Sequence, residues 1–280
     1  MKLLRILKNS PTLQRLYRFL SGAVKVLEFS IHIRNPVVRE QLSDYKSIPI
    51  IIISFNQLTH LKAQVSFLLK NGYNNVIIID NNSSYPPLLE YFEAMKRMVT
   101  IHILAENRGH MAFWHHSELY TLYSKGFYIV TDADVVPIEA CPENFVQQLI
   151  QKFIKNRRFT KVGLSLKLDD IPDSNLSKKE ILLWEQQYWT KKNSNHTFIA
   201  AIDTTFALYR PFYSYSKTDF FKSIRTDFPL QARHGGWYID HNRLTEEQEF
   251  YFSTCNSSSS WRLDKNKKII HSKYKIAKET

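Results

Sequence analysis

The sequence predicts an α/β fold in which helices flank a mostly parallel, doubly wound sheet. Residues 49–55 and 75–80 are continuous apolar, β-branched runs, which are typical of parallel strands buried on both faces. Between them, apolar residues recur at the spacing of one helix face and stop before Gly72; they are Leu58, Leu61, Val65, Leu68 and Leu69. Strands that alternate with helices in this way imply a parallel sheet.

The following segments continue this alternation and then become less regular. We expect, in chain order, a helix at 87–98, a strand at 99–104, a helix at 110–124, a strand at 127–130, a helix with Pro142 at its first position, and strands at 162–168 and within 198–209. Capping boxes at Ser177 and Thr245 predict two further helix starts, the first helix reaching about residue 191. The tail, residues 256–280, is polar and basic and receives no assignment.

The composition indicates one large globular domain. The chain has 280 residues, and its hydrophobic content of 44% is enough for a sizeable core, which excludes a disordered protein. Cys141 and Cys255 are the only cysteines, which excludes a disulfide framework or a cysteine-based zinc site and suits a reducing compartment.

The first 40 residues are both basic and amphipathic. They hold eight Lys and Arg residues against two Glu residues, in a chain of net charge +12. Charges interrupt every apolar stretch, so the segment is a poor transmembrane helix and a poor signal peptide. We expect it either to lie on the anionic inner face of the cytoplasmic membrane, as a peripheral contact of a cytoplasmic protein, or to pack on the domain with a solvated basic face. The basic residues are diffuse and no nucleic-acid motif is present, so no nucleic-acid partner is expected.

Two carboxylates, Asp132 and Asp134, directly follow the apolar strand that ends near Val130. Ligands of open α/β sheets bind outside the carboxyl ends of the strands. Mg2+ and Mn2+ prefer carboxylate oxygens and keep coordination positions open for phosphate. The pair with Ala133 between its members therefore predicts a divalent-metal site for diphosphate chemistry. The alternative is an Asp-rich turn that only ends a strand.

Polar groups also follow the other early strands, and the ends of parallel strands meet at one edge of a sheet. These groups are Ser54, Phe55 and Asn56 after the first strand, Asp80 after the second, and Asn107 and Arg108 after the third. Asp80 could accept a hydrogen bond from N3–H of uracil, and Phe55 could lie along a base. The local alternative is that Asn56 and Ser83 cap helices and Asp80 serves a turn.

In these motifs, over about residues 48–140, the chain resembles the GT-A glycosyltransferases, in particular the family 2 nucleotide-sugar-dependent enzymes. The resemblance implies a nucleotide-sugar-binding half at 46–140 and an acceptor-binding half with the tail at 141–280, after the basic segment 1–45. It also implies that Asp80 and Ser54 hold the nucleobase, Asp132 meets the ribose or the metal, and Asp134 ligates Mn2+ or Mg2+. The family's usual asparagine eight residues after Asn107 is His115 here.

Inverting transfer needs a carboxylate base to deprotonate the acceptor hydroxyl. The candidates are Glu247, then Asp240, then Glu246, although acids in a first helix turn also stabilise the helix dipole. The candidates for a third metal ligand are His234, His241 and His271, although a lone histidine is more often a packed or hydrogen-bonded side chain. Trp237 could stack on a sugar, and Asp203 interrupts an apolar strand and could face the acceptor.

The resulting hypothesis is a metal-dependent, inverting hexosyltransferase. It would move a sugar from a nucleoside-diphosphate donor, with a UDP-sugar favoured, to a glycan or lipid-linked hydroxyl in surface polysaccharide or lipopolysaccharide synthesis. One alternative is a nucleotidyltransferase that makes nucleotide sugars, but no glycine-rich loop follows the first strand. The other is a non-catalytic, membrane-associated protein that binds nucleotide or carbohydrate.

Overall fold

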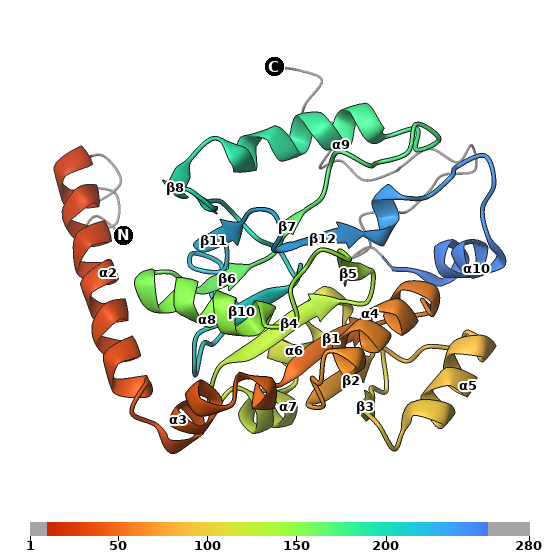
Figure 1. Ribbon diagram of the computed structural model, residues 1–280, viewed down its shortest axis with the longest axis horizontal. Coiled ribbons are helices and arrows are strands. Elements are labelled where there is room, and N and C mark those ends of the chain that lie inside the picture. Colours follow the sequence, from red (N-terminus) through yellow and green to blue (C-terminus); the bar gives the residue numbers. More distant parts are fainter. Residues whose placement is uncertain (1–9, 257–280) are drawn as a thin grey trace.

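The computed structural model describes residues 10–256, and its centre is a nine-stranded sheet (Figure 1). The strand order is β3-β2-β1-β4-β10-β6-β11-β9-β8; β10 and β9 are antiparallel to both their neighbours, and the other strands share one direction. The strands are β1 (Ile50–Ser54), β2 (Val76–Asp80), β3 (Thr100–Ile103), β4 (Tyr128–Asp132), β6 (Lys161–Gly163), β8 (Lys192–Ser194), β9 (Thr197–Ile199), β10 (Ala207–Tyr209) and β11 (Ser223–Thr226). The predicted α/β fold with a mostly parallel sheet flanked by helices is confirmed.

The first half of the chain forms the parallel part of the sheet, in the predicted order. Helices α4 (Thr59–Lys70) and α5 (Pro86–Met95) connect β1, β2 and β3. Gly72 follows α4 with a φ of 77°, a left-handed conformation that glycine adopts without steric cost. Ser54 pairs in register with Asp80, and Ile53 with Asp132. The three strand ends therefore lie together at one edge, as expected.

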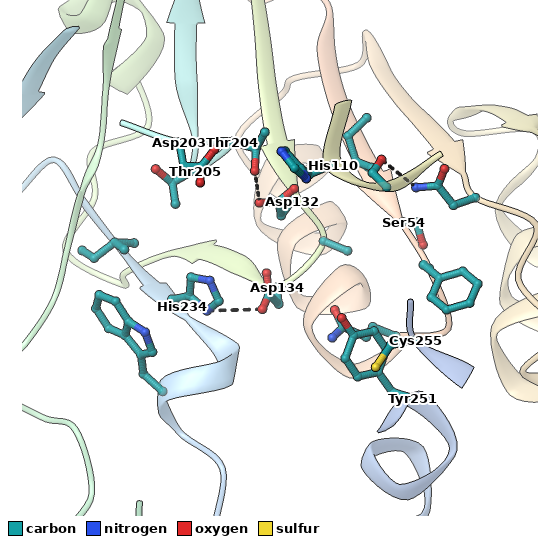
Figure 2. Close-up of a pocket in the computed structure, with 18 of the residues that line it drawn as sticks. Ser54, His110, Asp132, Asp134, Asp203, Thr204, Thr205, His234, Tyr251 and Cys255 are labelled. Atoms are coloured by element: carbon teal, nitrogen blue, oxygen red, sulfur yellow. Dashed lines mark hydrogen bonds and ion pairs between the residues drawn. The ribbon is translucent and has the colours of Figure 1, made fainter. Parts of the chain in front are cut away.

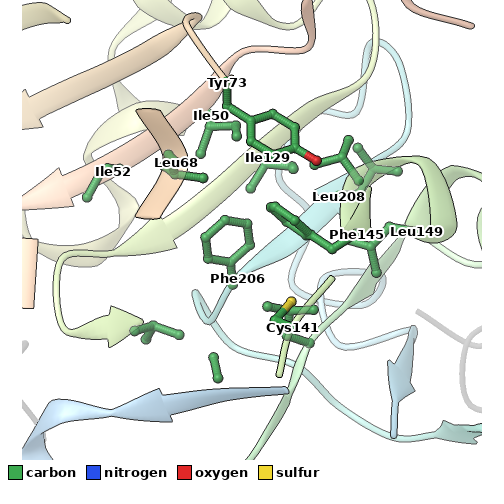
Figure 3. Packing of buried hydrophobic residues seen from close by; sticks show 14 of the residues in the cluster. Ile50, Ile52, Leu68, Tyr73, Ile129, Cys141, Phe145, Leu149, Phe206 and Leu208 are labelled. Carbon is green, nitrogen blue, oxygen red and sulfur yellow. The ribbon is translucent and has the colours of Figure 1, made fainter. Parts of the chain in front are cut away.

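The central strands are buried on both faces because alternate side chains point to opposite sides. Ile50 and Ile52 of β1 join one apolar cluster with Phe145 and Phe206, which Figure 3 shows. Ile51 and Ile53 join a second cluster on the other face. This explains why the first two strands are continuous apolar runs rather than alternating ones.

The prediction of a single helix at 110–124 is wrong. The segment is divided into a 3-10 turn, η2 (Gly109–Met111), and two short helices, α6 (Ala112–His115) and α7 (Ser117–Tyr123). His116 adopts an extended conformation between them, with ψ of 97°, and its imidazole accepts a hydrogen bond from the backbone N–H of Leu119. A histidine that caps α7 therefore ends the helical periodicity that the sequence suggested.

The strand expected at 162–168 belongs to two different sheets. It is divided at Leu164 into β6 and β7 (Ser165–Leu166). β7 lies in a three-stranded sheet with β5 (Val135–Pro137) and β12 (Gln231–His234), in the order β5-β12-β7. The strand expected within 198–209 is likewise two strands, β9 and β10, joined by an irregular loop.

The helices of the second half begin near the predicted positions. The helix expected from Pro142 is α8 (Phe145–Lys155), which begins three residues later, and the helix from Ser177 is α9 (Lys178–Glu185), which continues as the 3-10 turn η3 (Gln186–Trp189). The Ser177 side chain makes no capping hydrogen bond, so the prediction of a capping box at this position is wrong. The capping box at Thr245 is confirmed at the start of α10 (Glu246–Thr254).

The described part of the basic N-terminal segment, from residue 10 on, is mostly helical. It forms α2 (Pro11–His32), at the left edge of the molecule in Figure 1, and α3 (Pro36–Ser43), followed by the short turn η1 (Tyr45–Ser47). Among residues 10–256, no helix has the length and apolar character needed to cross a bilayer. The expected division at residue 140 falls between β5 and α8, and one sheet continues across it through the pairing of β4 with β10.

Candidate active site

A cleft of about 360 Å³ lies at the carboxyl ends of β1 and β4, between the large sheet, the small sheet and α9. Figure 2 shows its centre, with Asp132 and Asp134 between Asp203 and His234 on one side and Ser54 and Tyr251 on the other. The predicted site residues that line it are Ser54, Phe55, Asn107, Asp132, Ala133, Asp134, Asp203, His234 and Trp237.

Asp132 is the last residue of β4 and has a firm partner in the cleft wall. Its Oδ2 accepts a hydrogen bond from the hydroxyl of Thr204 (Figure 2). Burial raises the pKa of Asp132 well above its usual range, and the nearby carboxylate of Asp134 raises it further. Two acids in one partly buried cleft create an electrostatic cost that a bound cation would offset.

His234 reaches Asp134 because β12 pairs with β5 in the small sheet. This pairing places His234 opposite Val135, and the backbone N–H of Gly235 donates to the carbonyl oxygen of Asp134 at 2.6 Å. The Nδ1 of His234 lies 3.2 Å from Oδ2 of Asp134. A Cβ atom at Gly235 would overlap the imidazole of His60, so a larger residue there would require the His60 side chain to move.

Trp237 lies beside His234 in the same wall. The two rings stack with centroids 5.4 Å apart and an angle of 13° between their planes, so His234 covers one face of the indole that was expected to stack on a sugar. The indole Nε1 is buried and donates to no group among the described residues. Because a buried donor without a partner is costly, this N–H is a candidate contact for a bound ligand.

Asp80 and Asn56, expected at the nucleobase, lie behind the cleft wall. Both carboxylate oxygens of Asp80 accept hydrogen bonds from Ser83, at 2.6 and 2.7 Å, and burial raises the pKa of this fully buried acid. Oδ1 of Asn56 accepts from the backbone N–H groups of Ser84 and Tyr85. The structure thus gives Asp80 the turn role that we considered as the alternative. The helix caps considered for Asn56 and Ser83 are wrong, because the N-cap residues of α4 and α5 are Leu58 and Tyr85, neither of which makes a capping hydrogen bond with its side chain. Neither Asp80 nor Asn56 lines the cleft.

Asn107 and Arg108, at the end of β3, are separated by the structure. Asn107 lines the cleft, whereas the guanidinium of Arg108 is paired with Glu106 at 3.2 Å on the outer surface. Asn81 holds this loop: its Oδ1 accepts from the N–H of Arg108 and its Nδ2 donates to the carbonyl oxygen of Gly109.

The three acids expected as the base do not line the cleft. Glu247 caps the start of α4, since its carboxylate accepts hydrogen bonds from the N–H of Leu58, at 3.0 Å, and from the N–H and hydroxyl of Thr59. Asp240 accepts from the backbone N–H of Asn242, and Glu246 is exposed in the first turn of α10. Glu247 and Glu246 are explained by the favourable position of an acid at a helix N-terminus, and Asp240 by the geometry of a turn.

The loop between β9 and β10 supplies a wall of the cleft that the sequence indicated only through Asp203. Asp203, Thr204 and Thr205 all line the cleft. The loop is held by three side chains from the sheet, each of which donates to one of its backbone carbonyls. These are Lys161 to Asp203 at 2.9 Å, Arg225 to Ala201 at 2.8 Å, and Ser223 to Ala200 at 2.6 Å.

A buried ion pair forms the far end of the cleft and was not predicted. Arg225 of β11 contacts Glu185 of α9 at 2.6 Å, and its guanidinium lies 4.2 Å from the ring centre of Tyr188. Both charged groups are nearly inaccessible to solvent. Arg225 and Lys161 are charged residues within short strands. Because charged side chains are seldom buried without a partner, this is the signal in the sequence that could have identified them.

The metal-binding hypothesis rests on the two aspartates and His234. Within residues 10–256, no group of three or more His, Cys, Asp or Glu side chains is arranged as a complete metal site. Two carboxylates that lie close together in a cleft suit a hard cation whose remaining ligands come from a phosphate-bearing ligand and water. His271 and the lysines of the tail lie outside the described residues.

Comparisons with known proteins concern the fold. The chain matches no family model and no curated protein. Among solved structures, it is similar to a mannosyltransferase, PcManGT from Pyrobaculum calidifontis, in complex with GDP-Man and Mn2+ (13% identity, TM-score 0.42, covering 79% of this chain and 71% of that chain). It is also similar to residues 1–349 of TarS from S. aureus (11% identity, TM-score 0.42, 68% and 60% covered) and to a cytidylyltransferase from Leptospira borgpetersenii serovar Hardjo-bovis (14% identity, TM-score 0.31, 45% and 56% covered).

Proposed function

We propose that the protein is a metal-dependent glycosyltransferase that uses a nucleoside-diphosphate sugar. The observation that carries this proposal is the position of Asp132 and Asp134 in one cleft, at the carboxyl ends of β4 and β1. In this position two carboxylates can hold a divalent cation against a diphosphate. Ser54, Phe55 and Tyr251 form the side of the cleft proposed for the nucleoside.

The residues of the cleft have different proposed roles in the reaction. Asp132 and Asp134, with His234 beside them, would hold Mn2+ or Mg2+, which when bound neutralises charge on the leaving diphosphate. Thr204 orients Asp132 by donating its hydroxyl hydrogen. The indole N–H of Trp237 is placed to donate to an oxygen of the donor or the acceptor.

Asp203 is the general base that we propose for the inverting reaction. The carboxylates that line the cleft are Asp132, Asp134, Glu185 and Asp203. The first two are the proposed metal ligands, and Glu185 is held by Arg225 in a buried ion pair. Asp203 lines the cleft on a loop whose backbone is fixed by three hydrogen bonds, and it would take the proton of the acceptor hydroxyl as that oxygen attacks.

The acceptor that we propose is a hydroxyl of a glycan or a lipid-linked saccharide in surface polysaccharide or lipopolysaccharide synthesis. This context is supported by the basic, amphipathic N-terminal helix, which suits a protein that works at the inner face of the cytoplasmic membrane. A UDP-sugar is the donor to test first, with guanosine and cytidine nucleotides beside it.

Calorimetric binding of UDP, GDP and CDP, in Mn2+ and then in EDTA, tests the proposal. We expect one nucleotide to bind in Mn2+ and to lose at least about tenfold in affinity in EDTA or in Asp134→Asn. The control variant is Asp173→Asn, a carboxylate that is 96% exposed and pairs only with Lys178 among the described residues. Binding of no nucleotide by the folded protein, or equal binding by Asp134→Asn, would refute the metal site.

A further inference from the structure

Helix α2 has one side that is fixed to the domain. Phe29 is 1% exposed and packs between Phe127 and Phe153, with ring centres 6.1 and 5.6 Å away. Phe127 directly precedes β4 and Phe153 lies on α8, so the aromatic cluster joins α2 to the core. Burial of this phenylalanine stabilises the contact between α2 and the domain.

Polar contacts on the same side fix the orientation of the helix. The Nζ of Lys25 forms an ion pair of 2.8 Å with Asp219, and Arg210 donates to the backbone carbonyl of Lys25 at 2.6 Å. Both partners belong to the second half of the chain. α2 therefore presents a defined outer face rather than rotating freely about its axis.

The outer face of α2 is an apolar stripe. Its large side chains recur at helical spacing and are exposed; they are Leu16, Phe19, Leu20, Val24, Leu27 and Ile31. Phe19 is 72% exposed and Leu27 is 64% exposed. At 1.5 Å per residue, the stripe from Leu16 to Ile31 is about 22 Å long. No other part of residues 10–256 covers it, and isolated exposed apolar residues would not form such a row.

Basic residues border the stripe, and acids are absent beside most of its length. Residues 10–27 contain no Asp or Glu, and the one acid within the length of the stripe, Glu28, is 52% exposed and lies 3.7 Å from the guanidinium of Arg210. Exposed Arg15 and Arg34 lie toward the two ends of the helix. Arg157 and Arg158, which are also exposed, lie where α2 meets the domain: the Arg157 guanidinium is 5.7 Å from the ring of Phe29, and a Cβ atom at Gly22 would lie 4.0 Å from that of Arg158.

We propose that this outer face of α2 docks the protein in the plane of an anionic lipid bilayer. An apolar row with a basic border is the combination that binds a membrane interface, since the apolar side chains enter the acyl boundary while the arginines meet lipid phosphates. A second copy of the chain is a poorer occupant, because its own arginines would be brought against these arginines. This inference does not depend on sugar transfer.

Co-sedimentation of the full chain with vesicles tests the docking surface. We expect binding to vesicles of phosphatidylcholine with phosphatidylglycerol, and weaker binding to phosphatidylcholine alone. The double variant Phe19→Ser/Leu27→Ser should lose at least about tenfold in partition to the anionic vesicles, because two large apolar side chains no longer enter the bilayer. The matched control is Met98→Ser/Leu176→Ser, which removes apolar side chains of 56% and 62% exposure elsewhere on the surface.

The border is tested separately with Arg157→Gln/Arg158→Gln, which should weaken binding to anionic vesicles several-fold and leave binding to neutral vesicles unchanged. Absence of vesicle binding by the folded protein, or equal losses in the control and the stripe variant, would overturn the proposal. So would a dimer in solution that Phe19→Ser/Leu27→Ser dissociates while vesicle binding persists. Nucleotide binding by calorimetry should be the same in all these variants, which separates this inference from the proposed function.

Discussion

Lys161 donates a hydrogen bond from its Nζ to the backbone carbonyl oxygen of Asp203, at 2.9 Å, from inside the sheet. The ammonium group also donates to the hydroxyl of Tyr209 and lies 3.4 Å from the ring centre of Phe220. Lys161 is fully buried in β6, and it therefore connects the core of the sheet to the wall of the cleft. This contact positions the acid that we propose as the base, and it leads to the first two predictions.

Asp203→Asn should lower kcat by about 10²- to 10⁴-fold, the usual contribution of a general base. The amide has nearly the same shape as the carboxylate and keeps the loop in place, so nucleotide affinity should change less than about twofold. Transfer assays with the sugar conjugates of the nucleotide selected by calorimetry measure this, with Asp173→Asn as the control. Full activity of Asp203→Asn would return the role of base to another acid.

The stability of the protein should rise with pH because of Lys161. Burial lowers the pKa of Lys161 well below its usual 10.5 in the folded protein. Between the folded and unfolded pKa values the unfolded chain binds the extra proton, so the free energy of unfolding increases with pH there, by up to about 1.4 kcal/mol per pH unit.

Urea denaturation of the wild-type protein and of Lys161→Met at pH 7 to 10 measures this effect. The dependence should be flatter in Lys161→Met and unchanged in Lys125→Met, which alters an exposed lysine. Parallel pH profiles of the wild type and Lys161→Met would show that the buried amine does not titrate in this range.

Glu247→Ala should destabilise the protein without affecting the chemical step. The carboxylate caps the start of α4 through Leu58 and Thr59, and loss of such charge-assisted bonds lowers the free energy of unfolding by about 1–2 kcal/mol. Glu246→Ala, the exposed neighbour, should change it by less than about 0.5 kcal/mol. A large loss of kcat with unchanged stability in Glu247→Ala would instead identify Glu247 as the base.

Two glycine-to-alanine substitutions should change the free energy of unfolding in opposite directions. A Cβ atom at Gly163 in β6 would lie 2.7 Å from the carbonyl oxygen of Phe206 and 2.7 Å from the Cβ of Ala207, so Gly163→Ala should destabilise by about 1–3 kcal/mol. At Gly22, within α2, the nearest atom would be 4.0 Å away, and Gly22→Ala should stabilise by about 0.5–1 kcal/mol through helix propensity. Thermal or urea unfolding measures both changes. If both substitutions stabilise the protein, or both destabilise it, this account of the packing is contradicted.

Sequence reasoning located the first half of the fold because its signals are local. The apolar runs of β1 and β2, the helix periodicity of α4 and the stop at Gly72 each depend on neighbouring residues. The convergence of Ser54, Asp132 and Asn107 followed from a single rule about parallel strand ends. Short-range exceptions account for the errors in this half, as when His116 caps α7 and divides one expected helix into two.

By itself, the sequence determined an α/β fold, the pair Asp132 and Asp134 at its strand edge, and the amphipathic character of α2. Only the tertiary structure decided that Glu247 caps α4, that Lys161 and Arg225 fix the loop of Asp203, and that His234 reaches Asp134. These relationships join residues far apart in the chain through strand pairings such as β5 with β12. Their stabilisation is gained only when the whole sheet is assembled, so no local pattern of residues encodes them.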